Sequence, residues 1–218
     1  MKFFLDTANL DQIREAQELG ILDGVTTNPS LMAREGISGR NNILQHYIDI
    51  CDIVIGDVSA EVIATDLEGM IREGKELSGL HPQIVVKIPM TREGIMAIKH
   101  FSRLEIRTNC TLIFSIGQAL LAAKAGATYV SPFIGRLDDI SVDGVELIRS
   151  IVQLYRTYRF DTQVLAASVR HSMHIIQCAE AGAHVVTCPL KPILGLIDHP
   201  LTTAGLEKFL ADHRKLNS

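Results

Sequence analysis

The stretch IVVKIPMT, residues 84–91, places a lysine inside a short run of β-branched and apolar residues. Such a run, with Pro82 just before it and Pro89 at its end, predicts a buried strand. Lysine is rarely fully buried, and an amine taken out of water tends to give up its proton. The fold therefore has to explain why Lys87 stands in the middle of this strand.

The same kind of strand recurs along the chain, and a helical pattern follows it each time. Asn9 and Ser115 are placed to start two of the helices, Thr65 and Glu68 form a capping box for a third, and Gly20 ends the first. We predict eight strands, at residues 3–7, 24–29, 58–64, 84–89, 106–114, 128–134, 163–168 and 184–189.

Eight apolar strands that alternate with helices indicate a parallel sheet whose outer face is covered by helices. Eight such units fit a closed (β/α)8 barrel, the TIM barrel, as a single domain over residues 1–218. A doubly wound open sheet is the alternative, but it would need fewer strands, and the sequence has no GxGxxG or Walker loop. Residues 202–216 predict a further amphipathic C-terminal helix, which could pack on its own barrel or on a neighbouring subunit.

The composition is that of an ordinary globular protein, with 47% hydrophobic and 21% charged residues. A net charge of −4 gives no electrostatic reason to expect nucleic acid or a membrane surface as a partner, and no apolar run approaches membrane-spanning length. The four cysteines are widely spaced and form no CxxC pair. They predict buried free thiols in a cytoplasmic protein.

Polar residues gather where the predicted strands end, which is the face of a (β/α)8 barrel that carries the active site. Three ionisable residues, Asp6, Glu61 and Lys87, hold equivalent positions on separate strands and should converge in one barrel mouth. The full set is Asp6, Thr27, Asn28, Glu61, Lys87, Asn109, Thr111, Ser131, Arg136, Ser168, Arg170 and Thr187.

A structural lysine paired with Asp6 or Glu61 is the simplest interpretation of Lys87. The convergence of polar residues favours catalysis instead, because a desolvated amine can form a Schiff base with a carbonyl and a nearby carboxylate can move the protons. Arg136 and Arg170, each structural if taken alone, together suit a phosphate at the last strands of the barrel.

Three residues with helical spacing, His171, His174 and Cys178, could share a face and bind a metal ion. No fourth ligand is evident at a matching position. A helix face with one buried cysteine and two half-exposed histidines is the preferred interpretation, and we predict no metal site.

Several segments together make the chain resemble the short-chain transaldolase family, which includes the fructose-6-phosphate aldolases. GVTTNPS and VVKIPMT are the most specific of them. The matching segments are FFLDTAN, GVTTNPSL, SAEV, VVKIPMT, TNCTLIF, AGATYVSPFIGRLDD and LAASVRH, and AGAHVVTCPL and DHPLTTAGLEKFLADH extend the resemblance over nearly the whole chain.

The resemblance implies a role for each site residue. Lys87 would form the Schiff base, Asp6 would take the proton of the substrate's C4 hydroxyl, and Glu61 with Thr111 would hold a proton-relaying water. Further residues would bind substrate: Asn28, Asn109 and Ser131 at the dihydroxyacetone part, and Arg136, Ser168 and Arg170 at the sugar phosphate.

The implied reaction is reversible transfer of a dihydroxyacetone unit in the pentose phosphate pathway. The donor would be sedoheptulose 7-phosphate or fructose 6-phosphate, and the acceptor glyceraldehyde 3-phosphate or erythrose 4-phosphate. The resemblance implies neither a metal nor a cofactor, because the imine is the electron sink. It also implies a homo-oligomer, typically a decamer of two pentamers, with the terminal helix reaching a neighbour.

Two positions separate transfer from simple cleavage within this resemblance. The aldolases carry tyrosine where Phe133 stands and glutamine where Glu61 stands. Because phenylalanine has no proton to give to the carbanion, we expect transfer rather than release of free dihydroxyacetone. The alternatives are a fructose-6-phosphate aldolase and, more remotely, a barrel that binds sugar phosphates without catalysis.

Overall fold

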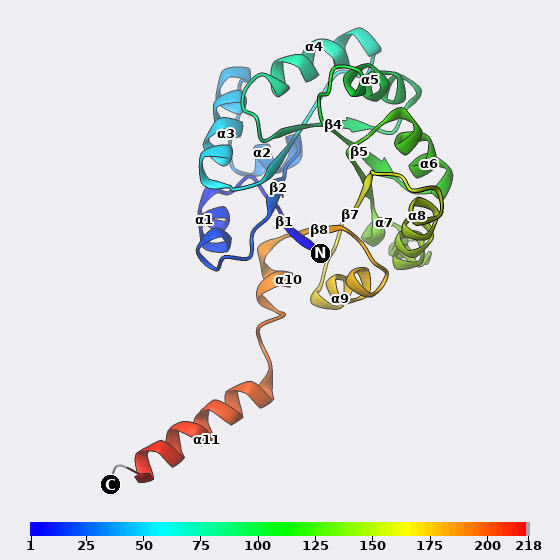
Figure 1. Ribbon diagram of the computed structural model, residues 1–218. Coiled ribbons are helices and arrows are strands. Elements are labelled where there is room, and N and C mark those ends of the chain that lie inside the picture. Colours follow the sequence, from blue (N-terminus) through cyan, green and yellow to red (C-terminus); the bar gives the residue numbers. More distant parts are fainter. Residues whose placement is uncertain (217–218) are drawn as a thin grey trace.

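The computed structural model describes residues 1–216, and these form a closed barrel of eight parallel strands with the C-terminal helix outside it (Figure 1). Each strand pairs with the next along the chain, and β8 pairs with β1 to close the barrel. The predicted (β/α)8 barrel is confirmed, and the open-sheet alternative is wrong. The strands are β1 Lys2–Asp6, β2 Gly24–Thr26, β3 Asp57–Glu61, β4 Ile84–Pro89, β5 Thr108–Ile113, β6 Tyr129–Pro132, β7 Gln163–Ala166 and β8 Val185–Cys188.

Helices surround the barrel and cover the outer faces of the strands (Figure 1). The bounds are α1 Leu10–Glu18, α2 Pro29–Arg34, α3 Arg40–Ile53, α4 Leu67–Ser78, α5 Arg92–Ser102, α6 Ile116–Ala125, α7 Ile134–Asp138, α8 Gly144–Tyr158, α9 Ser172–Glu180, α10 Leu190–Leu194 and α11 Pro200–Leu216.

Short-range signals set most helix boundaries. The side chains of Asn9 and Ser115 accept hydrogen bonds from backbone N–H groups three residues on, as predicted. The predicted capping box at residues 65–68 is wrong in detail, because Asp66, and not Thr65, caps α4 by accepting from the N–H of Gly69 at 2.8 Å.

Four helices, α2, α3, α7 and α10, were not predicted as elements. The longest of them, α3, starts after Gly39, which has no side chain to cap it, so the sequence carries no start signal there. The short helices α7 and α10 also lack a side-chain cap. By contrast, α2 does carry a start signal in the sequence, because Asn28 caps it and Pro29 occupies its first position.

The alternation of side chains along each strand divides the core into two parts. One set faces the helices and forms the large outer core. The inward set forms a compact apolar cluster of Phe4, Val85, Tyr129, Leu165, Val185 and Ala167. Gly24 also faces inward, and a Cβ there would come within 2.6 Å of the Phe4 ring, so this position has no room for a side chain.

A polar cluster lies below this apolar layer, near the N-terminal ends of the strands. Asp57 at the start of β3 pairs with the guanidinium of Arg107 and accepts a hydrogen bond from the hydroxyl of Tyr129 at 2.7 Å. Tyr129 thus joins the apolar layer to the polar one. Filled in this way, the lower barrel is a packed core rather than a pore.

The four cysteines, Cys51, Cys110, Cys178 and Cys188, are buried free thiols, as predicted. Burial raises the pKa of Cys110 and of Cys188 to about 12, so these thiols stay protonated and unreactive at neutral pH.

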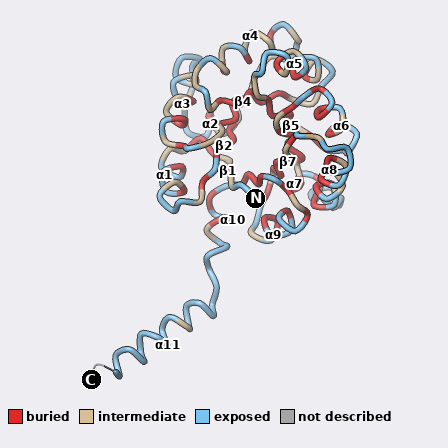
Figure 2. Tube along the Cα trace, viewed as in Figure 1, coloured by how far each residue is buried: buried red, intermediate tan, exposed pale blue. Residues whose placement is uncertain are grey.

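The C-terminal helix α11 begins at Pro200, two residues before the predicted start, and projects away from the barrel (Figure 1). Nothing in it is buried (Figure 2). Among residues 1–216, no helix combines the length and the apolar character that crossing a bilayer would need.

Candidate active site

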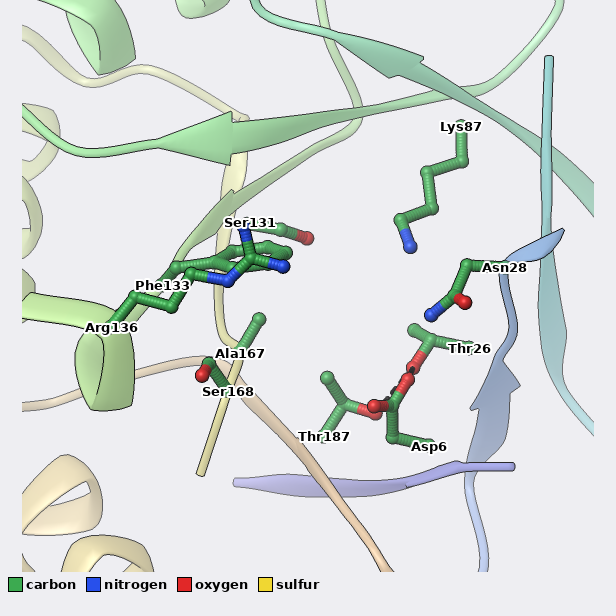
Figure 3. Close-up of a pocket in the computed structure, with 10 residues that line it drawn as sticks. All are labelled: Asp6, Thr26, Asn28, Lys87, Ser131, Phe133, Arg136, Ala167, Ser168 and Thr187. Atoms are coloured by element: carbon green, nitrogen blue, oxygen red, sulfur yellow. Dashed lines mark hydrogen bonds between the residues drawn. The ribbon is translucent and has the colours of Figure 1, made fainter. Parts of the chain in front are cut away.

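Two adjoining cavities, of about 150 and 490 Å³, lie at the C-terminal ends of the strands. Figure 3 shows the residues that line the smaller one, which come from β1, β2, β4, β6 and β8, from the turns just beyond β2, β6 and β7, and, for Arg136, from α7. The two cavities share Asp6, Asn28, Lys87, Phe133 and Arg136. Because they share these residues, the two cavities form one site. The smaller is called the deep cavity below, and the larger the open cavity.

Lys87 stands at an inward-facing position of β4 and is only 5% exposed. Its Nζ lies 3.1 Å from Oε2 of Glu61, its register partner on β3, and donates a hydrogen bond to the carbonyl of Thr27 at 3.2 Å. The strand lysine is therefore a buried amine paired with a carboxylate at the mouth of the barrel. A lysine amine attacks a carbonyl in its neutral form, and the carboxylate of Glu61 is placed to exchange protons with it.

Asp6, at the end of β1, lines both cavities together with Lys87. Burial raises the pKa of this carboxyl above its usual value, and Lys87, a hydrogen bond from Thr26 and the charge of Arg34 oppose the rise in decreasing order. A carboxyl group whose pKa is raised towards neutrality is suited to take up and return protons.

Two hydroxyls hold Asp6 in place. Thr26 donates to Oδ1 of Asp6 at 2.8 Å, and the Oγ1 atoms of Thr26 and Thr187 lie 2.6 Å apart. Because the Thr26 proton goes to Asp6, Thr187 is the donor in the second bond. This chain of donors leaves the other carboxylate oxygen of Asp6 for a substrate.

Asn109 forms part of the floor beneath Lys87, its register partner on β4, and is fully buried. Its amide nitrogen donates to the hydroxyl of Ser59 at 3.2 Å, and its amide oxygen accepts from the hydroxyl of Ser131 at 2.7 Å. Ser131 lines the deep cavity whereas Asn109 does not. Asn109 therefore orients Ser131 and does not itself line the cavity.

Thr111 lines the open cavity beside Glu61 and Lys87, and its buried hydroxyl has no hydrogen-bond partner. A buried hydroxyl without a partner is costly, and a water molecule between Thr111 and Glu61 would satisfy it. Asn28 caps α2 with its side-chain oxygen, at 3.0 Å from the N–H of Leu31. Its amide nitrogen is left to point into the cavity (Figure 3).

On the opposite wall, the guanidinium of Arg136 lies over the ring of Phe133, 4.9 Å from its centroid (Figure 3). Ser168 follows β7 and has a φ of 58°, a conformation that is costly for a residue with a side chain. Arg136 and Ser168 both line the deep cavity. This wall therefore offers a positive charge and a hydroxyl to an anionic group.

Arg170 does not line either cavity. It lies on the rim, where its guanidinium forms two hydrogen bonds to the carboxylate of Asp139. Eleven residues received a role from the family resemblance, Phe133 included. Ten of them line the cavities or, like Asn109, lie directly beneath them, and Arg170 lies outside.

Thr26, Ser59 and Arg34 were not among the predicted site residues. Thr26 and Ser59 precede Asn28 and Glu61 by two residues, so the two-residue alternation of a strand could have placed them on the inward face. Arg34 lines the open cavity from α2, an element that was not predicted.

The two histidines considered above as metal ligands instead cap a helix and contact a carboxylate. His171 is exposed and caps α9, while His174 is buried, not half-exposed as expected, and lies 3.0 Å from the carboxylate of Asp138. Burial lowers the pKa of His174. In residues 1–216, no group of three His, Cys, Asp or Glu residues is arranged to hold a metal ion.

Comparison with known proteins gives a family over the full length. The sequence model described as transaldolase/fructose-6-phosphate aldolase matches residues 3–218. A probable transaldolase of Cytophaga hutchinsonii is 73% identical over 217 residues, covering 100% of both chains. A probable transaldolase of Porphyromonas gingivalis is 70% identical over 217 residues, covering 100% of this chain and 99% of the relative.

Among solved structures, a phosphoenolpyruvate phosphomutase from Streptomyces platensis subsp. rosaceus superposes with a TM-score of 0.63. The two chains are 12% identical, and the match covers 100% of this chain and 95% of the other. At that identity the likeness concerns the barrel fold alone.

Proposed function

This chain belongs to the transaldolase/fructose-6-phosphate aldolase family, and we infer that it is a transaldolase that moves a dihydroxyacetone unit between sugar phosphates. One observation carries the mechanism: the buried amine of Lys87 lies 3.1 Å from Glu61 in a cavity that it shares with Asp6. A non-catalytic sugar-phosphate-binding barrel would have no need of such an amine.

Imine formation begins when the neutral amine of Lys87 attacks the C2 ketone of fructose 6-phosphate or sedoheptulose 7-phosphate. The departing ketone oxygen needs two protons to leave as water. Glu61 takes protons from the nitrogen of Lys87 and, through a water held at the unpartnered hydroxyl of Thr111, delivers them to that oxygen one after the other. Counted from the ammonium form of Lys87, the nitrogen gives up two protons and keeps one in the imine. Water leaves, and a protonated Schiff base remains. In this scheme Asn28 and Ser131 donate hydrogen bonds to the hydroxyls of the three-carbon part, while Asn109 orients Ser131.

Cleavage follows when Asp6 takes the proton of the C4 hydroxyl. The C3–C4 bond breaks, its electron pair moves into the protonated imine to form an enamine, and C4 leaves as the carbonyl carbon of an aldose phosphate. In the reverse direction the enamine attacks an acceptor aldehyde, and Asp6 returns its proton to the new hydroxyl. Hydrolysis of the imine then releases the product ketose.

The substrate phosphate would bind at Arg136 and Ser168, with Arg170 next to them on the rim. Guanidinium groups bind phosphate through paired donors, and Ser168 adds a hydroxyl. A coupled assay tests the whole proposal: fructose 6-phosphate with erythrose 4-phosphate should yield glyceraldehyde 3-phosphate. No product from purified, folded protein would refute it.

Transfer rather than cleavage is supported by the residue at position 133. The Phe133 ring lines the deep cavity, carries Arg136 on one face and contacts Phe114, with ring centroids 5.8 Å apart. It brings no acidic proton to the enamine, so the enamine persists until an acceptor aldehyde arrives. A fructose-6-phosphate aldolase would need a proton donor here.

Replacing Phe133 with tyrosine is therefore expected to raise the release of free dihydroxyacetone from fructose 6-phosphate roughly tenfold, because a phenol can protonate the enamine. The measurement is free dihydroxyacetone formed without an acceptor aldehyde. Phe114→Tyr, which changes the neighbouring ring outside the deep cavity, is the matched control. An unchanged release rate in Phe133→Tyr would show that position 133 does not decide between transfer and cleavage.

We also propose that the protein is a homo-oligomer, with the decamer of two pentamers as the expected form, and that α11 docks on a second copy of this chain. The helix contains no buried residue, yet Leu206, Phe209 and Leu210 form an apolar stripe at positions i, i+3 and i+4. Phe209 is 71% exposed. An apolar stripe that its own barrel does not cover is typical of an interface.

A chain shortened to end at Asp198 is expected to form smaller particles than the full chain, as measured by light scattering coupled to gel filtration. The barrel should stay folded because α11 buries nothing against it. Leu206→Ser with Phe209→Ser should act in the same direction, and Glu207→Ser with Lys208→Ser on the same helix is the matched control. Equal particle mass for full and shortened chains would contradict the role of α11.

The four free thiols support a further proposal, that the enzyme works in the reducing cytoplasm.

A further inference from the structure

Arg170 forms an ion pair with Asp139 on the rim of the site. The mechanism above uses Arg170 for the substrate phosphate but gives Asp139 no role. The carboxylate of Asp139, the residue just after α7, accepts from Nη1 of Arg170 at 2.7 Å and from Nη2 at 2.5 Å. Both side chains are half exposed. Exposed ion pairs contribute little to stability, so a different reason for the pair has to be sought in its geometry.

A guanidinium group has more than one edge that can make paired hydrogen bonds. Asp139 occupies the edge between Nη1 and Nη2, which leaves the edge formed by Nε and one Nη. The free edge lies near Gly135: a Cβ built on this glycine would come within 2.6 Å of Arg170 Nε and 3.1 Å of Ser168 Oγ. A Cβ there would also lie 2.3 Å from the carbonyl oxygen of Ser168, so only a glycine lets Arg170 Nε and Ser168 Oγ, two donors that the proposed phosphate would use, lie this close to each other.

We propose that Asp139 is a positioning residue, which turns Arg170 so that its free edge faces the phosphate of the substrate next to Ser168. This rests on the proposed function, since it concerns how the transaldolase site recognises a phosphorylated sugar. A long arginine on a rim has many rotamers, and fixing one of them before binding reduces the entropy lost when the phosphate arrives.

The backbone around this pair is held by other bonds. The N–H of Ile134 donates to the carbonyl of Ala167 at 3.0 Å, and that of Gly135 donates to the carbonyl of Ser168 at 3.1 Å. Asp138 adds a contact to His174 at 3.0 Å. Removing the carboxylate of Asp139 should therefore free the Arg170 side chain without releasing the segment that carries it.

The test compares a phosphorylated with an unphosphorylated acceptor. With fructose 6-phosphate as donor, kcat/KM is measured for erythrose 4-phosphate and for erythrose by following the glyceraldehyde 3-phosphate that both reactions release. Asp139→Asn should lower the ratio of the two kcat/KM values about tenfold, because of the two acceptors only erythrose 4-phosphate has a phosphate for Arg170. The kcat/KM for erythrose, which in a two-step transfer does not depend on donor binding, should stay close to that of the wild type, as should the melting temperature.

Two further variants define the control and the rescue. Asp139→Glu keeps the carboxylate and should restore part of the ratio. Glu146→Gln breaks the similarly exposed pair of Glu146 with Arg149 on α8 and should leave the ratio unchanged.

The outcomes separate this inference from the function on which it rests. An unchanged or increased ratio in Asp139→Asn would overturn the positioning role, and an increase would mean that Asp139 competes with the phosphate. Equal losses with both acceptors would mean a structural role and would overturn it too. No product from the wild type, or a wild-type ratio in Arg170→Ala, would overturn the proposed function or its phosphate site, and this inference with it.

Discussion

Lys87→Met is expected to lower kcat for transfer at least about 10⁴-fold, because the variant keeps the length of the side chain but has no amine to form the imine. The measurement is the coupled assay with fructose 6-phosphate and erythrose 4-phosphate. Methionine suits the site sterically, since residues 84–88 of β4 are all buried.

Trapping with borohydride gives a second readout that does not depend on turnover. Wild-type protein incubated with fructose 6-phosphate and reduced should carry a dihydroxyacetone unit as a secondary amine on the peptide that contains Lys87. The same peptide from Lys87→Met should stay unmodified. Full activity in the variant, or a trapped unit on another lysine, would remove Lys87 from the mechanism.

The partner of Lys87 needs its own control, because the variant leaves the carboxylate of Glu61 without the ammonium 3.1 Å away. Removing one member of a buried ion pair costs about 3–5 kcal/mol of stability, although the side chain of Glu61 is 17% exposed and water will reduce that figure. Lys87→Met with Glu61→Gln removes both charges. This double variant should regain stability and remain inactive, which separates catalysis from folding.

The second large effect is expected at Asp6. Asp6→Asn should lower kcat by about 10²–10⁴-fold, because an amide cannot take the proton of the C4 hydroxyl. The imine should still form, since Lys87 and Glu61 are untouched. Borohydride should therefore trap the uncleaved six-carbon sugar on Lys87 in this variant, instead of the three-carbon unit.

The same substitution should stabilise the fold near neutral pH. Because burial raises the pKa of Asp6 above its ordinary value of 3.8, the folded state binds more protons than the unfolded state between pH 3.8 and the raised pKa. The free energy of unfolding therefore falls as pH rises through that window, and the charged carboxylate is a net cost above it. Asparagine removes this cost and can still accept the hydrogen bond from Thr26.

The check is thermal unfolding of the wild type and Asp6→Asn at a series of pH values. The melting temperature of the variant should exceed that of the wild type at pH 7 to 8, and the gap should narrow as the pH approaches 4. Asp11→Asn, at a carboxylate that is 91% exposed, should show no comparable gap. A less stable Asp6→Asn at pH 7 would mean that the carboxylate is a stabilising partner of Lys87 instead.

Much of the fold could be predicted from the sequence because strand and helix periods are local. The β-branched run at residues 84–88, bounded by prolines, predicted a buried strand, and eight such runs alternating with helices left the closed barrel as the simplest arrangement. Asp6, Glu61 and Lys87 were expected together for the same reason, since the C-terminal ends of parallel strands meet at one face. The structure places all three at one cavity.

The sequence by itself thus determined the barrel, the face that carries the site and the residue types that gather there. Tertiary structure alone decided which of those residues are partners. Thr26 and Thr187 are 161 positions apart and meet only because β8 closes the barrel against β1. Arg170 is held by Asp139, 31 residues away in the sequence. The position of Arg170 after the seventh strand predicted that it lies near the mouth of the barrel, but not which residue it pairs with. The physical reason is range: a strand's alternation and a helix's turn depend on neighbouring residues, whereas the partner of a charged or hydroxyl side chain depends on how distant segments close together.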